Sequence, residues 1–220
     1  TKFNEGAGSF TADKKKFYFT RCAEPIKSSG GTEFQCSIFI SKLENGSWSE
    51  PVKLNPNINA PEEWNAQPAV SPKGDTLFFV SKRPGGQGHH DIWYSTCFNA
   101  DDMWGPAINM GKNINTNGIE MSPSYYPKDH TLFFASNGLK GFGGLDIYKA
   151  QGKDFSEVNT AGLPFNSNRD DFYFTLGNKK GFLASNRQGG HGNDDIYIFN
   201  IEGQDAVIAI IDADSLKKVK

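Results

Sequence analysis

One loop motif occurs three times in this 220-residue chain, each time between two hydrophobic segments. Each copy joins a Phe- or Leu-rich segment that ends in Ser to an Asp-Ile-aromatic segment, across a glycine-rich stretch of constant length. The Ser and Asp pairs are Ser81 and Asp91, Ser136 and Asp146, and Ser185 and Asp195. A looser copy comes first, at Lys16–Thr20 and Ser37–Ser41. A unit that recurs about every 50 residues restricts the possible folds more strongly than composition does.

Two further motifs lie between these loops and complete the repeat. Trp48 and Trp104 each precede a Pro, and each is followed by an Asn-Ile-Asn segment, at 57–59 and 113–115. Each unit therefore contains about four short strands, which is the content of a β-propeller blade. The predicted units are residues 5–59, 60–116, 117–166 and 167–200, and the last shows no fourth strand of its own within that range.

Composition supports an all-β chain. The sequence has 24 Gly, 11 Pro and 18 Phe, so aromatic strands alternate with turns, and a helical bundle is disfavoured. The net charge of −2 argues against a general nucleic-acid surface. No apolar run is long enough to suggest a membrane span. The predicted fold is a β-propeller with four visible four-stranded blades.

The glycine-rich loops suggest a structural role for the Asp that ends each of them. Glycine supplies the positive φ angles of tight turns, and an Asp carboxylate can accept hydrogen bonds from loop N–H groups. We therefore interpret Asp91, Asp146 and Asp195 as turn clamps. A calcium or catalytic role is the alternative for these three residues, because calcium needs several converging oxygens.

The repeats resemble a known family. Phe-Phe-x-Ser, the Asp-Ile-Trp/Tyr segment, Trp-x-x-Pro and Asn-Ile-Asn are similar to the TolB-type (WD-like) propeller repeat. More narrowly, they resemble the propellers of periplasmic OmpA-family lipoproteins of Bacteroidetes. That family includes peptidoglycan-binding components of the type IX secretion system. The matching stretches are residues 11–41, 67–115, 121–148 and 181–197.

The resemblance implies a larger architecture. It implies a six-bladed ring of which residues 1–202 supply four blades, followed at 203–220 by a linker and the first strand of a carboxypeptidase-regulatory-like sandwich. The chain is then a fragment that contacts the cell wall through domains outside it. The implied location is the periplasm, in association with the outer membrane, and the implied partners are other periplasmic or outer-membrane proteins. The resemblance implies neither a cofactor nor a membrane span.

The three cysteines bear on the compartment. Cys22 ends the second strand of the first unit and Cys36 begins the third, so hairpin pairing would bring them within disulfide range. A Cys22–Cys36 disulfide would brace the long loop between them and would fit an oxidising compartment. Two free thiols in a cytosolic protein are the alternative, and Cys97 is expected to pack without a partner cysteine.

Other reactive patterns are weak. His89 and His90 adjoin Asp91, but neighbouring residues of an extended segment point to opposite faces, so solvated loop histidines are favoured over a metal site. A glycoside hydrolase would need two carboxylates close together, but nothing in the sequence places Glu120 near Glu62 and Glu63. Lys14–Lys16 is interpreted as a solvated turn. Trp48 and Trp104 are expected to pack on their own blades, with a sugar or peptide platform as the alternative.

The sequence predicts a candidate binding face. Loops between second and third strands emerge on the same side of a propeller as loops between blades. The first set carries Arg83, His89, His90, Lys140, Arg187 and His191. The second set carries Asn57, Asn59, Asn113, Asn115 and Thr116. Such a face would suit an acidic or polyhydroxylated partner.

The predicted function is a non-enzymatic interaction or scaffold domain. The competing hypotheses are a glycan-binding or glycan-hydrolysing propeller, the propeller of a prolyl-oligopeptidase-like enzyme, and a purely structural spacer between domains.

Overall fold

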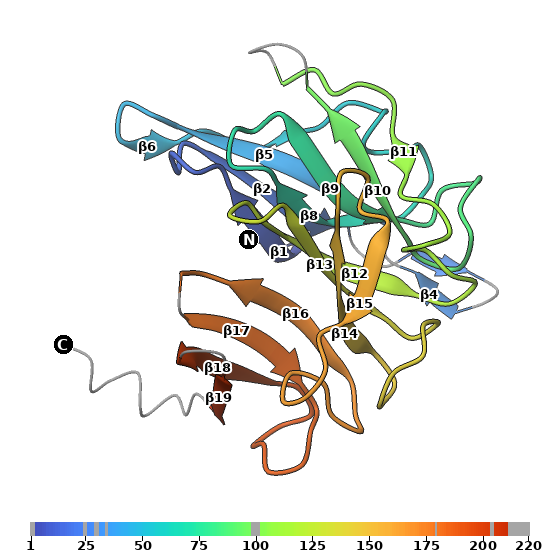
Figure 1. Ribbon diagram of the computed structural model, residues 1–220. Helices are drawn as coiled ribbons and strands as arrows, with labels where there is room; N and C mark the ends of the chain where they lie inside the picture. Colours follow the sequence, from blue (N-terminus) through green and yellow to red (C-terminus); the bar gives the residue numbers. More distant parts are fainter. Residues whose placement is uncertain are drawn as a thin grey trace. The chain divides into compact units, whose positions relative to one another are not determined.

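Alternating apolar residues build the strands of this chain. The computed structural model describes residues 3–23, 26–28, 31–33, 35–97, 102–178, 180–202 and 205–210 (Figure 1). These residues form strands, turns and short irregular segments, and none of them lies in a helix. No helix long and apolar enough to cross a membrane occurs in this part of the chain. The chain divides into two compact units, Thr1–Pro123 and Ser124–Lys220.

The first sheet contains β1 (Asn4–Phe10), β2 (Lys16–Cys22) and β5 (Cys36–Glu44), all antiparallel. Its outer position is shared by two short strands that both pair with β5, β6 (Ser47–Trp48) and β7 (Val52–Lys53). A separate hairpin, β3 (Ile26–Ser28) and β4 (Gly31–Glu33), lies in the loop between β2 and β5.

The second sheet has the order β11-β10-β9-β8. Its strands are β8 (Asn65–Val70), β9 (Thr76–Ser81), β10 (Asp91–Thr96) and β11 (Ile108–Asn109). The third sheet has the order β12-β13-β14-β15, from β12 (Glu120–Tyr126), β13 (Thr131–Ser136), β14 (Asp146–Gln151) and β15 (Glu157–Thr160). Both sheets follow the chain order, as propeller blades do.

The fourth sheet contains β16 (Asp171–Leu176), β17 (Lys180–Ser185), β18 (Asp195–Glu202) and β19 (Asp205–Ile210). The structure therefore pairs residues 205–210 with β18, where the repeat pattern showed no fourth strand. The predicted sandwich strand extends to residue 219, and its part from 211 onward lies outside the described residues.

The chain is an all-β protein in which one sheet of five strands, two of which share the outer position, and three sheets of four strands form four blades of a β-propeller. The six-bladed ring and the domain boundaries remain predictions.

A residue in an unusual conformation recurs in the first strand of every sheet, and in β1, β8 and β16 it lies at a bulge. Ala7, Gln67, Ser122 and Tyr173 all have positive φ, between 38° and 53°. In the first unit, two of these residues are tied to other blades by side chains. The Gln67 N–H donates to Thr20 Oγ1 at 2.9 Å, and the Ser122 N–H donates to Gln67 Oε1 at 2.7 Å. Such bulges bend a strand locally and end regular pairing.

Candidate functional site

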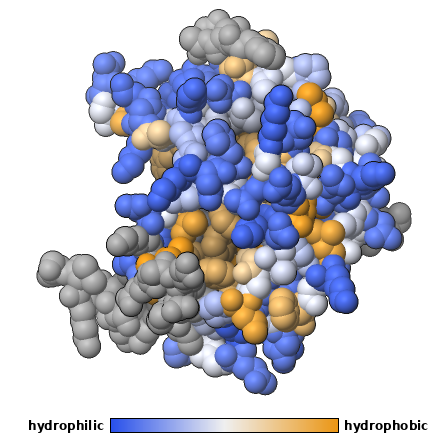
Figure 2. All heavy atoms as spheres, viewed as in Figure 1, coloured by the Kyte–Doolittle hydropathy of each residue, from blue (hydrophilic) through white to orange (hydrophobic). Residues whose placement is uncertain are grey.

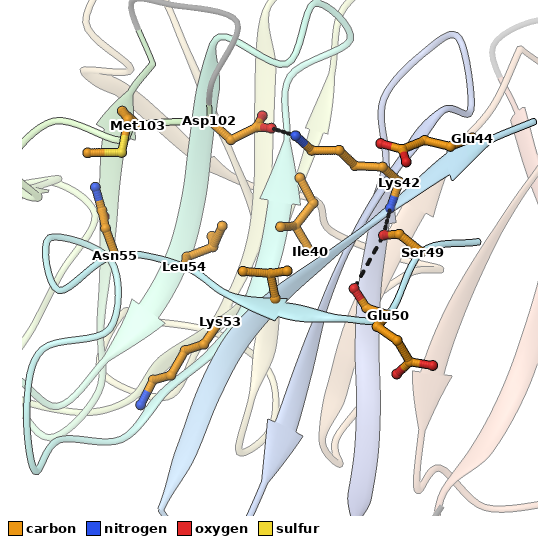
Figure 3. Close-up of a pocket in the computed structure, with 11 residues that line it drawn as sticks. Ile40, Lys42, Glu44, Ser49, Glu50, Lys53, Leu54, Asn55, Asp102 and Met103 are labelled. Atoms are coloured by element: carbon orange, nitrogen blue, oxygen red, sulfur yellow. Dashed lines mark hydrogen bonds and ion pairs between the residues drawn. The ribbon is translucent and has the colours of Figure 1, made fainter. Parts of the chain in front are cut away.

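A groove of about 560 Å³ lies at the outer edge of the first sheet (Figure 3). Its residues come from β5, from the segment Ser49–Asn55 that includes β7, and from Asp102 and Met103. Ile40 and Leu54 are its buried apolar residues. Lys42, Glu44, Glu50 and Lys53 supply charges along it.

The local sequence explains why the groove forms beside β7. Asn45 and Gly46 have positive φ, so the chain turns sharply after β5 and returns as β6. Ser49 then interrupts the outer strand: its Oγ accepts from the Lys42 N–H at 3.0 Å, and its carbonyl accepts from Ser41 Oγ at 2.7 Å. The chain rejoins β5 only where Val52 pairs with Ile40.

Asp102 forms a charged wall of the groove. Its side chain is almost buried, and it forms ion pairs with Lys16 at 2.5 Å and with Lys42 at 2.7 Å. The Tyr18 hydroxyl also donates to Asp102, at 3.2 Å. Burial alone would raise the pKa of the Asp102 carboxyl, but hydrogen bonds and charges from Lys16 and Lys42 outweigh it and hold the pKa below its usual value. Burial, followed by the Asp102 charge, raises the pKa of Tyr18.

The groove combines apolar and charged surface. Val52 and Met103 are both more than half exposed at its edge, and two lysines and two glutamates line the same groove. An exposed apolar pair flanked by both signs of charge is suited to an amphiphilic chain such as a polypeptide. Sequence reasoning missed this site, because Asp102 and Met103 belong to no repeated motif.

The three Asp side chains at the loop ends act as hydrogen-bond acceptors, as expected of turn clamps. Asp91 accepts from the Gln87 and Gly88 N–H groups, and Asp195 accepts from those of His191 and Gly192. The equivalent donors to Asp146 come from Phe142 and Gly143, both at 2.9 Å.

A glycine next to each carboxylate explains the conserved spacing within the repeats. A Cβ on Gly86, Gly141 or Gly190 would approach the Asp carboxylate to 2.5 Å or less. Among the residues that the structure describes, no three His, Cys, Asp or Glu side chains gather as a metal site would require.

The Arg83 side chain is half-buried and hydrogen-bonds several neighbouring groups. Its guanidinium donates to Ser81 Oγ at 2.9 Å, to the Asn57 and Ile58 carbonyls, and to Asn65. Burial lowers the pKa of Arg83 to about 10.

Arg187 repeats this arrangement in the second unit. It donates to Ser185 Oγ, to the Pro164 and Phe165 carbonyls, and to Asp171, with which it forms an ion pair at 2.5 Å. The two arginines therefore fasten their loops to the segment that enters each blade, a role that the sequence analysis did not assign to them.

The other predicted binding residues differ in exposure. His89, Lys140 and His191 are exposed on their loops. His90 is half-buried, edge-on to the Trp64 ring at 5.1 Å between ring centroids. Ligand binding by these four residues remains a prediction.

The asparagines assigned to the same face need a correction. Asn59 and Asn115 are buried, and each hydrogen-bonds the backbone of the third strand of its blade. They cannot meet a ligand, because no part of the side chain reaches solvent to a useful extent. Asn57 and Asn113 remain exposed.

The structure also shows the environments of the cysteine and tryptophan residues. A disulfide joins Cys22 to Cys36 across the paired ends of β2 and β5, as the sequence predicts, and Cys97 is half-buried and takes no part in this bond. Trp104 is buried in the core, whereas Trp48 is about half exposed and lies against Phe10 and Phe17. The two tryptophans that precede a Pro therefore have different environments.

Comparison with known proteins is informative for the fold alone. No family model matches the chain, and no curated protein matches it. Among solved structures, a puromycin hydrolase matches with a TM-score of 0.58 at 10% identity, over 95% of this chain and 31% of that one. A puromycin-hydrolysing peptidase of Mycobacterium tuberculosis matches with a TM-score of 0.55 at 10% identity, over 93% of this chain and 28% of that one.

A glycosidase also shares the fold. An α-L-arabinofuranosidase from Lactobacillus brevis matches with a TM-score of 0.54 at 12% identity, over 87% of this chain and 70% of that one. The chain thus spans less than a third of the length of the puromycin-hydrolysing proteins that it matches.

These matches correct one expectation. The sequence predicts a domain that is not an enzyme, and that prediction is wrong. The solved proteins with this fold include peptidases and a glycoside hydrolase. Because the identities are low, the likeness establishes the fold and not a reaction.

Proposed function

We propose that the chain is a recognition domain of a larger protein, and that it binds an extended polypeptide segment in the groove beside β7. The observation that carries this proposal is the lining of that groove. Val52 and Met103 expose apolar surface at its edge, and Lys42, Lys53 and Glu50 can pair with charges of either sign. Peptide recognition commonly combines apolar anchors with a charged rim.

We further propose that the domain works outside the cytoplasm. The Cys22–Cys36 disulfide supports an oxidising compartment, since such bonds are rare in cytosolic proteins. Together with the repeat resemblance, it supports a periplasmic, outer-membrane-associated protein of the OmpA lipoprotein family, with a type IX secretion component as the narrower possibility. Its partners would be other periplasmic or outer-membrane proteins, and cell-wall contact would belong to other domains.

A glycan ligand is the second candidate. Two observations favour it: the fold match to an arabinofuranosidase, and the half-exposed Trp48 beside Phe10, because exposed aromatic rings can stack on sugars. This candidate includes both binding and hydrolysis.

A peptide array and a glycan array, probed in parallel, separate the two candidates. The peptide candidate predicts binding that the double substitution Val52→Asp with Met103→Asp reduces at least about tenfold. The matched control is Ile108→Asp, which alters an equally exposed apolar residue of β11 outside the groove and should leave binding unchanged. Binding or cleavage of arabinose- or xylose-containing glycans, lost on Trp48→Ala and not in the groove variant, would replace the peptide proposal.

A further inference from the structure

The second and third strands of each sheet present equivalent side chains on two opposite faces. Cross-strand pairs define these faces in the second sheet: Phe79 and Trp93 lie on one face, and Phe78 and Tyr94 lie on the other. We call the first the back face and the second the forward face. Forward positions are occupied by Tyr18 and Ile38, Phe78 and Ile92, Phe133 and Ile147, and Phe182 and Ile196.

The forward face of the fourth sheet is exposed where its equivalents are buried. Ile38, Ile92 and Ile147 are each 0% exposed, whereas Ile196 at the same position is 61% exposed. Phe182 is 42% exposed, against at most 8% for the aromatic residues at its position in the other three sheets. An apolar surface that is buried in three repeats and open in the fourth suggests a missing neighbour.

The back face of the first sheet is exposed at one end, although Phe19, at the position of Phe79, is buried. Phe10 and Trp48 are each about half exposed and cover Phe17, with ring centroids 4.3 Å apart between Phe10 and Phe17. Phe17 itself is only half-buried, although Leu77 and Leu132 at its position are fully buried. Figure 2 shows apolar side chains gathered in patches between hydrophilic areas on one face of the molecule.

Packing within each unit shows which surface a forward face fits. In the first unit, Tyr18 and Ile38 of the first sheet share a core with Phe79 and Trp93 on the back face of the second. In the second unit, the forward-face residues Phe133 and Ile147 share a core with Leu183 and Tyr197 on the back face of the fourth. A forward face is therefore complementary in shape to the back face of another sheet of this type.

We propose that the forward face of the fourth sheet docks on the back face of the first sheet in a second copy of this chain. Among the residues that the structure describes, Phe10 and Trp48 are large exposed aromatic residues on the back face of the first sheet. A second copy of the chain therefore offers a back face on which the forward face of the fourth sheet can pack. Two different patches meet in such a contact, so the association is head-to-tail. This surface is separate from the groove beside β7.

The test measures the mass of the full chain by light scattering over a concentration series. We expect a mass above 24.2 kDa that rises with concentration. The double substitution Phe182→Asp with Ile196→Asp should weaken association more than about tenfold, since it places charges in an apolar contact. Phe10→Asp with Trp48→Asp should do the same from the other side. All four residues are at least 42% exposed, so circular dichroism should show folded variants.

A mixture of the two variants gives the decisive result. Each variant retains the patch that the other has lost, so an equimolar mixture should form a one-to-one complex although neither variant associates alone. Ile108→Asp, the equally exposed control on β11, should behave as the unaltered chain. A chain that stays monomeric at every concentration, a double variant that keeps the original association, or a mixture that forms no complex would each overturn the proposal.

Discussion

The side-chain amide of Asn115 hydrogen-bonds both backbone groups of Ile92, as a residue of a neighbouring strand would. Its Oδ1 accepts from the Ile92 N–H at 2.8 Å, and its Nδ2 donates to the Ile92 carbonyl at 2.9 Å. Asn59 makes the same pair of bonds to Ile38, and Asn166 makes it to Ile147. The amide therefore holds the start of the third strand in three blades, where the segment after the outer strand also donates a backbone bond to the same carbonyl.

Replacing Asn115 by Ala should destabilise the chain by about 1–3 kcal/mol, because the buried Ile92 N–H loses its partner, while the Ile92 carbonyl keeps the bond from the Met110 N–H. Urea unfolding followed by circular dichroism measures the change. Asn113→Ala is the matched control, since Asn113 belongs to the same motif but is exposed, and it should change stability by less than about 0.5 kcal/mol. Equal effects of the two substitutions would contradict the structural role of Asn115.

Arg187→Lys should cost about 2–3 kcal/mol of stability, since lysine cannot reproduce the fork of donors toward Ser185, Phe165 and Asp171. The loss would also leave the buried Asp171 carboxylate poorly paired. Lys140→Ala, on the exposed loop of the third blade, serves as the comparison and should be nearly neutral. If Arg187→Lys were as mild as Lys140→Ala, the arginine would be available for a ligand after all.

Repeat spacing was sufficient to predict the blades, because each strand and loop occurs several times and errors in one copy are corrected by the others. The disulfide followed from hairpin geometry in the same way. The groove was not predictable, since it depends on Asp102 and Met103, which approach β5 only in the folded chain. The roles of Arg83 and Asn59 were also missed: a charged or polar residue in a loop gives no sign that its donors are already used by the backbone.

Removing the disulfide should lower stability without removing the fold. The bond links residues 14 apart in sequence, and closing a loop of that size contributes about 3 kcal/mol by the chain-entropy estimate. The double substitution Cys22→Ser with Cys36→Ser should therefore lower the urea midpoint, and a reducing agent should lower that of the unaltered chain by a similar amount. Cys97→Ser should leave the sensitivity to reduction intact. A midpoint that is indifferent to reductant would show that the bond does not contribute.

His90 should make the stability of the chain depend on pH between about 6.5 and 4. Burial, assisted by the charges of Lys82 and His89 and opposed by Asp91, lowers the pKa of His90 to about 4. Its Nδ1 is buried without a hydrogen-bond partner, so the folded chain resists taking up the proton. The unfolded chain binds that proton near pH 6.5. Stability is therefore complete above pH 6.5 and declines as the pH falls toward 4.

His90→Phe keeps the ring contact with Trp64 but removes the titrating group, so its stability should decline less over this range. The difference should be on the order of 1 kcal/mol, because the His90 ring is partly exposed and solvent screens its charge. Urea unfolding at half-unit pH steps measures both profiles, and His191→Gln, at an exposed histidine of another loop, should follow the unaltered chain. Parallel profiles for His90→Phe and the unaltered chain would exclude His90 as the origin of the pH dependence.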